Sequence, residues 1–303
     1  MLYSGSEYLA LPRDPQPWLV EGLIPSGGLV NFYGKPKTGK SWGALGLAIA
    51  ISNAEQHWNG FKIHNPGPVA YIQIDTPRSS WAKRINELIK AGHKLNNLYM
   101  TDRSAPDFPY PFNIQLPNHY EWLKLNCAQV NFKLIIIDTL RECFSGNEND
   151  SDVMKSVINN IVDATNPAAV MLISHRRKGG LQNEFGGQID DLMDDMRGSG
   201  YLAGRADVIM KLTDHELHYQ GRDVEKDNLA IRRDGIGLVV AKDMNERLIQ
   251  LAIKQAVVEG ERLNYSILRM GERACELSGD TITVDAARKR IERMMGKKTK
   301  ADN

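Results

Sequence analysis

The sequence Leu29-Val-Asn-Phe-Tyr-Gly34-Lys-Pro-Lys-Thr-Gly39-Lys40-Ser41 places a glycine-containing turn between two predicted elements. The segment from Gly34 to Ser41 matches the pattern G-x-x-x-x-G-K-[ST] in full. The apolar residues before it are typical of a short strand, and residues 40–52, rich in Ala, Leu and Ile, predict a helix. A turn in this setting predicts a phosphate-binding loop, because its N–H groups and the helix N-terminus face one point.

Each conspicuous residue of this loop has a reason to be there. Gly34 and Gly39 permit backbone angles and a close approach that a Cβ atom would block. Lys40 would bring positive charge to the β- and γ-phosphates, and Ser41 would offer a hydroxyl to Mg²⁺. The expected ligands are ATP and Mg²⁺, and a chance match on an ordinary strand-to-helix turn is the alternative. The candidate nucleotide-binding residues are Gly34, Lys35, Pro36, Lys37, Thr38, Gly39, Lys40, Ser41 and Trp42.

Length and composition narrow the class of protein. The chain has 303 residues, of which 42% are hydrophobic, so it can bury a core and is not a disordered tail. Its 38 Lys and Arg balance 37 Asp and Glu, and the formal net charge is +1. This balance excludes a globally basic nucleic-acid coat, so any contact with DNA or RNA requires a local patch.

The cysteines and the absence of apolar targeting segments predict a cytoplasmic protein. Cys127, Cys143 and Cys275 lie far apart, form no C-x-x-C pair and are odd in number. This pattern favours reduced thiols over a zinc site or a disulfide framework. No signal peptide precedes residue 17, and the apolar run Trp42 to Ile51 is too short to span a bilayer, so we expect no membrane contact.

The pattern of the whole chain predicts an α/β fold. Buried strands are expected at 69–74, 134–137 and 168–174, and helices at 79–91 and 152–164. Their alternation favours a mainly parallel sheet with helices on both faces. Beyond the glycine-rich connection 176–200, strands are expected around 207–212, 215–220 and 228–233. The sequence therefore predicts an ATPase core with a lead-in segment over residues 1–245 and a helical, basic C-terminal extension over 246–303.

Two acidic residues end predicted strands and complete the expected site. Asp138 closes the run Leu134-Ile-Ile-Ile137, where a carboxylate would hold the magnesium shell through water. Asp75 follows the strand after the loop's helix and is the candidate for orienting the attacking water. The alternative for either residue is an ordinary turn or helix-capping role.

Several further segments give the chain a family resemblance. They are Trp18-Leu-Val-Glu-Gly-Leu-Ile-Pro25, Gly34 to Ser41, Ile135-Ile-Ile-Asp-Thr-Leu140, Glu148-Asn-Asp150, Ser174-His175-Arg-Arg-Lys-Gly179, Arg197-Gly-Ser199 and Gly221-Arg-Asp223. In this order, over about residues 17–235, they resemble the RecA-fold P-loop ATPases that include RepA-like hexameric replicative helicases of plasmids and phages. The resemblance implies a RecA-like core. It also implies an ATP-hydrolysing DNA helicase that translocates on single-stranded DNA in replication or recombination.

The resemblance also implies roles for particular residues. His175 would sense the γ-phosphate, and Arg176, Arg177 and Lys178 would hold single-stranded DNA in the channel of a hexameric ring. ATP would lie between subunits, where Arg205 or Arg222 of a neighbour would act as the arginine finger. The family normally has Glu at the position of Asp75. A plasmid- or phage-encoded protein that acts in the host cytoplasm is also implied.

Other readings of the sequence stay open. The same core could build a RecA/RadA-like filament-forming recombinase, although no N-terminal polymerisation motif is evident. The short acid Asp75 is compatible with a weakly hydrolysing DNA-binding or regulatory module. Residues 260–296 could form a DNA-binding helix-turn-helix or a solvated amphipathic helix followed by a frayed, basic tail. A metal site at His215 and His218 is not expected, because residues i and i+3 of a strand point to opposite faces.

Overall fold

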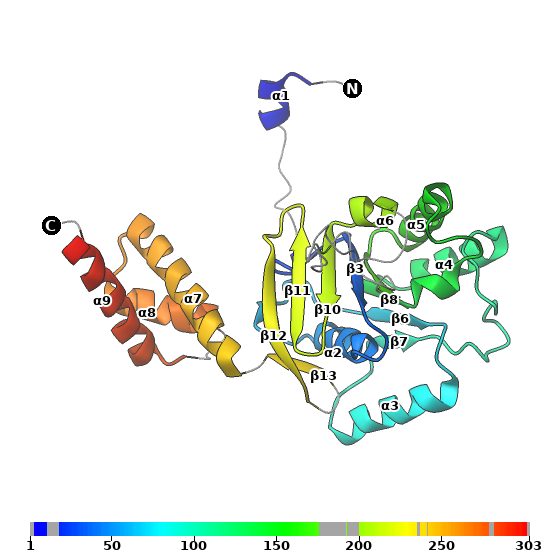
Figure 1. Cartoon of the computed structure of the whole chain (residues 1–303), viewed down its shortest axis with the longest axis horizontal. Helices are drawn as coiled ribbons and strands as arrows, with labels where there is room; N and C mark the ends of the chain where they lie inside the picture. The colour runs from blue at the N-terminus through cyan, green and yellow to red at the C-terminus, as the bar shows by residue number, and fades with distance from the viewer. Residues whose placement is uncertain are drawn as a thin grey trace, which may run out of the picture.

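A nine-stranded sheet forms the centre of the computed structural model, which describes residues 3–10, 18–175, 192, 200–234, 237–240, 242–278 and 282–301 (Figure 1). Several strands, such as β8, are buried on both faces, as their continuous apolar sequences predict. From one edge to the other the strands are β13 (Gly237–Val240), β12 (Asp227–Asp234), β11 (Glu216–Gly221), β10 (Val208–Leu212), β3 (Leu29–Gly34), β9 (Ala169–His175), β8 (Leu134–Asp138), β6 (Val69–Gln73) and β7 (Leu98–Met100).

The strands from β10 to β7 all run parallel, and β11 to β13 extend the sheet in antiparallel fashion. Gly34 at the end of β3 pairs in register with Leu212 on one side and His175 on the other. Gln73 at the end of β6 pairs with Asp138 at the end of β8. The carboxyl ends of the parallel strands therefore meet at one edge, where ligands bind in open α/β sheets.

Helices cover both faces of the sheet (Figure 1). Helices α2 (Lys40–Ser52) and α3 (Arg78–Lys90) pack on one face, and α4 (Pro117–Ala128), α5 (Ser151–Thr165) and α6 (Gly200–Arg205) pack on the other. Consecutive strand residues alternate between the two cores, so that Ile136 contacts the first and Ile137 the second. The predicted fold class is confirmed.

The lead-in segment contains more regular structure than its prolines indicate. Strands β1 (Trp18–Val20) and β2 (Ile24–Pro25) form a hairpin whose residues Leu19, Val20, Leu23 and Ile24 are buried in the first core. The gain from burying these side chains outweighs the loop-like composition around them. The remaining short elements are α1 (Gly5–Ala10), the hairpin of β4 (His57–Trp58) and β5 (Phe61–Lys62), and a 3₁₀ turn (Leu140–Cys143).

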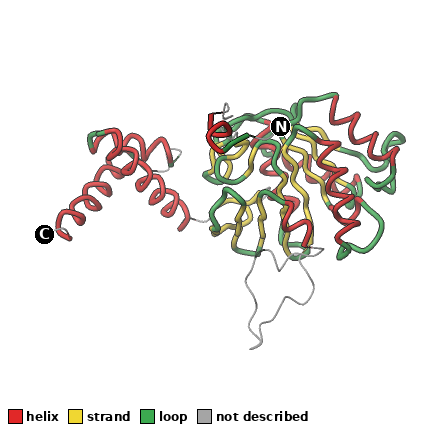
Figure 2. The backbone as a smooth tube through the Cα atoms, turned by 90° about the horizontal axis from the view of Figure 1, so that it is seen from above, coloured by secondary structure: helices red, strands yellow, loops and turns green. Residues whose placement is uncertain are grey.

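The C-terminal residues form a bundle of helices with its own core. Helices α7 (Lys242–Leu263), α8 (Ile267–Leu277) and α9 (Val284–Ala301) pack around Ile253, Ala256, Met270, Ala274 and Ile291. Figure 2 shows this bundle beside the sheet. The helical nature predicted for this region is confirmed. In the part of the chain that the structure describes, no helix is both long and apolar enough to cross a membrane.

Candidate nucleotide-binding site

The loop between β3 and α2 has the conformation that its glycines permit. Gly39 has φ of 97°, in the left-handed region that favours glycine. A Cβ atom on Gly34 would lie 2.3 Å from the carbonyl oxygen of Leu212, so no larger residue fits there. Helix α2 begins at Lys40 without a side-chain cap. Its first N–H groups therefore face the loop as donors for an anion.

Lys40 is folded back onto this loop. Its Nζ atom donates to the carbonyl oxygens of Gly34, at 3.0 Å, and Lys35, at 2.8 Å. Burial lowers the pKa of Lys40 to about 8, and the charge of Asp138 opposes this shift. The ammonium group is thus held by two neutral acceptors in a poorly solvated place, where an anionic phosphate is a stronger partner.

Asp138 is buried at the end of β8 and belongs to a small polar network. The hydroxyl of Tyr71 donates to Oδ2 of Asp138 at 2.8 Å and lies 3.4 Å from the backbone oxygen of Ser41. Burial raises the pKa of Asp138, and hydrogen bonds from Ser41 and Tyr71 oppose the shift. A buried carboxylate that meets the start of the P-loop helix is suited to a cation.

One cavity of about 440 Å³ brings most of the predicted residues together. The loop and the start of α2 supply Pro36, Lys37, Gly39, Lys40, Ser41 and Trp42. The strand ends supply Asp75, Asp138 and His175. Gly34, Lys35 and Thr38 do not line this cavity; Thr38 instead donates to the carbonyl of Lys35 within the loop, at 2.9 Å.

The two strand-end candidates reach this cavity from different sides. Asp75 is exposed in the turn between β6 and α3, and its backbone oxygen accepts from Arg103 at 3.0 Å. His175 is half-buried at the end of β9, beside Gly34. The preceding residue, Ser174, is fixed by its hydrogen bond to Asn31 Oδ1 at 2.8 Å. Both candidates therefore border the space in front of the P-loop.

The arginine candidates lie at the opposite edge of the sheet. Arg205 ends α6, just before β10 begins, and β10 is parallel to β3. Arg222 donates to the carbonyl of Gly204 at 2.9 Å and lies 3.8 Å from Asp207, whose carboxylate accepts from the N–H of Leu29. Within one chain neither arginine borders the cavity. Arg176, Arg177 and Lys178 lie outside the described residues.

Sequence reasoning did not find Arg84, which also lines the cavity. The side chain comes from α3 and has Trp81 three residues before it. A cation on the first helix after Asp75 was a weak signal, because exposed arginines on helices are common. Tyr71 was also missed, because a tyrosine in an apolar strand has an ordinary place in the core.

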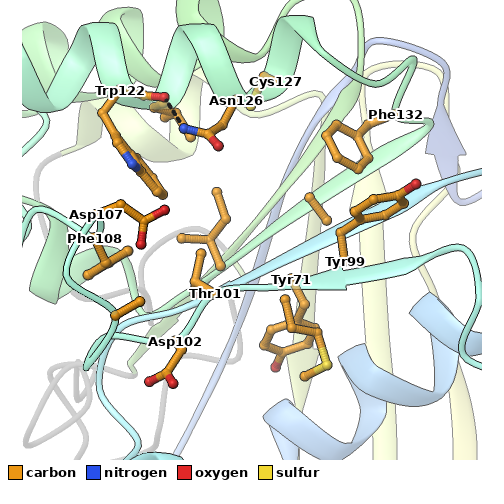
Figure 3. Close-up of a pocket in the computed structure, with 15 residues that line it drawn as sticks. Tyr71, Tyr99, Thr101, Asp102, Asp107, Phe108, Trp122, Asn126, Cys127 and Phe132 are labelled. Carbon is orange, nitrogen blue, oxygen red and sulfur yellow. Dashed lines mark hydrogen bonds between the residues drawn. The ribbon is translucent and has the colours of Figure 1, made fainter.

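A second cavity, of about 330 Å³, lies at the β7 edge of the sheet (Figure 3). Tyr99, Phe108, Trp122 and Phe132 form much of its wall. Asn126 donates to the backbone oxygen of Trp122 at 2.8 Å. None of the residues predicted for nucleotide binding lines this cavity, so it is separate from the P-loop site.

The residues at the P-loop fit a magnesium nucleotide. The tight approach at Gly34, the uncapped start of α2 and the carbonyl-bound ammonium of Lys40 suit a phosphate chain. Ser41 and Asp138 are the oxygen donors for Mg²⁺, which in such sites takes few protein ligands and keeps several waters. In the described ranges no group of three or more His, Cys, Asp or Glu residues is arranged to hold a metal ion, and His218 instead pairs with Glu216 at 3.0 Å.

A phosphate-binding loop at the centre of a mostly parallel sheet, with an acid ending a neighbouring strand, defines a P-loop nucleoside triphosphatase. Residues 5–180 match the AAA domain family AAA_25, and the chain belongs to this family. The family supports ATPase activity and nucleotide binding.

A solved structure confirms the RecA-like fold. The chain is similar to a structure whose title describes it as an ATPase domain, with a TM-score of 0.52 and 14% identity, over 71% of this chain and 85% of that one. A KaiC-like protein, PH0186, from Pyrococcus horikoshii OT3 also matches, with a TM-score of 0.47 and 13% identity, over 74% of this chain and 93% of that one. No curated protein sequence matches the chain.

Proposed function

We propose that the chain is the motor of an ATP-dependent DNA helicase or translocase. It moves on single-stranded DNA in replication or recombination and hydrolyses ATP at the subunit interfaces of a hexameric ring of identical chains. The observation that carries this proposal is the division of the site between two edges of the sheet. The phosphate cavity lies at one edge, and Arg205 and Arg222 lie at the other.

The chemistry follows from the residues at the cavity. Lys40 and the N–H groups at the start of α2 hold the β- and γ-phosphates. Asp75 accepts a hydrogen bond from a water molecule whose oxygen attacks the terminal phosphorus. The bond from that phosphorus to the bridging oxygen of ADP then breaks. Mg²⁺ held by Ser41 and, through water, by Asp138 would neutralise charge on the phosphate oxygens.

A neighbouring chain supplies the remaining positive charge. Arg205 is the stronger candidate for this finger, because the guanidinium of Arg222 already donates to Gly204 within its own chain. No hydrogen bond or ion pair ties Arg205 to another described residue. His175 senses the γ-phosphate and passes the state of the nucleotide to Arg176, Arg177 and Lys178, which hold the DNA.

The core of residues 1–245 carries this activity, and residues 246–303 form an accessory helical unit. The separate hydrophobic core of α7, α8 and α9 supports this division. Cys127 and Cys143 form no disulfide within the described part of the chain, which supports action in a reducing cytoplasm.

The test uses the whole chain, Mg²⁺, ATP and a forked DNA duplex. We expect hydrolysis that single-stranded DNA stimulates, separation of the duplex, and loss of both in the Lys40→Met variant. If the native chain neither separates the duplex nor shows DNA-stimulated hydrolysis, the proposal is wrong. Electron microscopy with a non-hydrolysable ATP analogue and single-stranded DNA distinguishes a ring from the filament of a recombinase-like ATPase.

A weakly hydrolysing, nucleotide-dependent DNA-binding module is the second candidate. The observation in its favour is Asp75, whose side chain is one methylene shorter than the glutamate of the resembling helicases. A chain that binds ATP and DNA but hardly hydrolyses ATP would favour this candidate over the motor.

A further inference from the structure

Arg84 is held between two indole rings at the wall of the phosphate cavity. Its Cζ atom lies 5.3 Å from the ring centroid of Trp42 and 5.1 Å from that of Trp81. Trp42 follows Ser41 in the first turn of α2, and Trp81 is on α3, so the stack joins the two helices beside the cavity. Stacking on aromatic faces orients a guanidinium and leaves its N–H donors in the ring plane unused.

The donors of Arg84 are not taken by protein acceptors. Its Nη1 atom is buried without a hydrogen-bond partner, and no carboxylate in the described part of the chain forms an ion pair with Arg84. A buried donor without an acceptor costs free energy. An arginine kept in this state beside a phosphate-binding loop is matched to an acceptor that the ligand brings.

Arg84 stands at the phosphate end of the cavity. It lines the cavity together with Lys40, Asp75 and Asp138. Burial raises the pKa of Asp138, and the charge of Arg84 is one of the influences that oppose this shift, so the guanidinium acts close to the end of β8. The group that Lys40 binds and that faces Asp75 is the terminal phosphate.

We propose that Arg84 binds the terminal phosphate of ATP from within the same chain as the P-loop and thereby distinguishes ATP from ADP. This inference rests on the proposed ATPase function and adds a phosphate-binding residue to that site. It also assigns a separate task to each cation. Lys40 loses charge in weakly alkaline solution, since its pKa is about 8. A guanidinium keeps its charge and offers several donors in a fixed plane.

The experiment compares the affinity for a non-hydrolysable ATP analogue with the affinity for ADP, both with Mg²⁺, by titration calorimetry on the whole chain. We expect Arg84→Gln to weaken binding of the analogue by about 10- to 100-fold, the range for hydrogen bonds to charged groups, while ADP binding changes by less than about twofold. Arg84→Lys keeps the charge with fewer directed donors and should lose several-fold affinity for the analogue alone.

Lys83→Gln is the matched control, because Lys83 is exposed on the same helix and does not line the cavity. It should leave both affinities unchanged. Equal losses for the two nucleotides in Arg84→Gln, or no loss, would overturn the proposal. If Arg84→Gln does not fold, Arg84→Lys decides by the same comparison. A native chain that binds and hydrolyses ATP without separating DNA refutes the helicase proposal alone, whereas a native chain that binds neither nucleotide refutes both.

Discussion

Lys40 combines a functional role with an electrostatic cost. Its side chain is buried, and its pKa of about 8 lies below the ordinary value of 10.5. Between these two pH values the unfolded chain binds more protons at this residue than the folded chain does. The burial of Lys40 therefore opposes folding fully below about pH 8, and this effect disappears as the pH rises toward 10.5.

This sign gives a prediction for Lys40→Met. The variant should lose most nucleotide affinity, because the charge that meets the phosphates is gone. From about pH 8 to about pH 10 the free energy of unfolding of the native chain should rise relative to that of the variant, by at most about 1.4 kcal/mol per pH unit. Urea unfolding of both chains at several pH values measures this difference. Parallel pH profiles would contradict it.

Asp75 sets a second prediction at the residue scale. Its carboxylate is exposed at the cavity, and its place is fixed through the backbone by Arg103. Asp75→Asn should reduce the hydrolysis rate by about 10²- to 10⁴-fold while nucleotide binding persists, since only the water-orienting group is removed. Steady-state phosphate release and calorimetry measure the two effects.

Asp75→Glu separates the motor from the weakly hydrolysing module. For the motor, the longer side chain should change the rate little or lower it, because the backbone is placed for aspartate. A low native rate that rises strongly in Asp75→Glu would instead favour the module.

At the scale of elements, the contact of β3 with β10 fixes the P-loop. The backbone of Gly34 approaches the carbonyl of Leu212 so closely that a Cβ atom would lie 2.3 Å from this oxygen. Gly34→Ala must push the two strand ends apart and should destabilise the chain by about 1–3 kcal/mol. Gly204→Ala is the control, since a Cβ atom there meets nothing within 4 Å and the helix prefers alanine. Denaturant unfolding checks both, and equal stabilities would contradict the steric argument.

The central elements could be predicted from sequence, because each has a strong local signal. The continuous apolar run at β8, the apolar residues of β9 and the glycine pattern before α2 each indicate one type of structure. Strand β7, with only three residues, was not predicted. Helix α4 was also missed: Leu125 on this helix is exposed, and its apolar residues follow no clean helical period.

The candidate site was predicted where the chemistry depends on local sequence. The P-loop, Asp75 and Asp138 were found from motif and strand ends, and the structure brings them to one cavity. Arg84 and Tyr71 could not be found this way. Their roles depend on which side chains the α2–α3 layer places next to Ser41 and Asp138, and this is a property of packing between distant segments.

At the scale of the whole molecule, the proposed finger predicts complementation between inactive chains. Arg205→Gln chains keep an intact P-loop, and Lys40→Met chains keep an intact Arg205. Each should hydrolyse ATP poorly alone, and a mixture should regain activity at interfaces that join the two intact parts. Phosphate release from the mixture measures this gain.

The control for complementation mixes Lys40→Met with Asp75→Asn. Both substitutions damage the cavity side of the chain, so no interface between these variants contains a complete site. Absence of recovery in the Arg205→Gln mixture as well would contradict an arginine supplied by a neighbour.

The parallel direction of β3 and β10 has a consequence for symmetry. The P-loop and Arg205 lie at opposite ends of these strands, so a contact that joins them uses two different surfaces. A two-fold pair joins like surfaces and completes no site, whereas head-to-tail association lets each chain both lend and borrow. An open stack always leaves one terminal P-loop without a lender, and a closed ring leaves none. Catalytic output per chain would thus grow gradually with the length of a stack but appear in one step on closure of a ring.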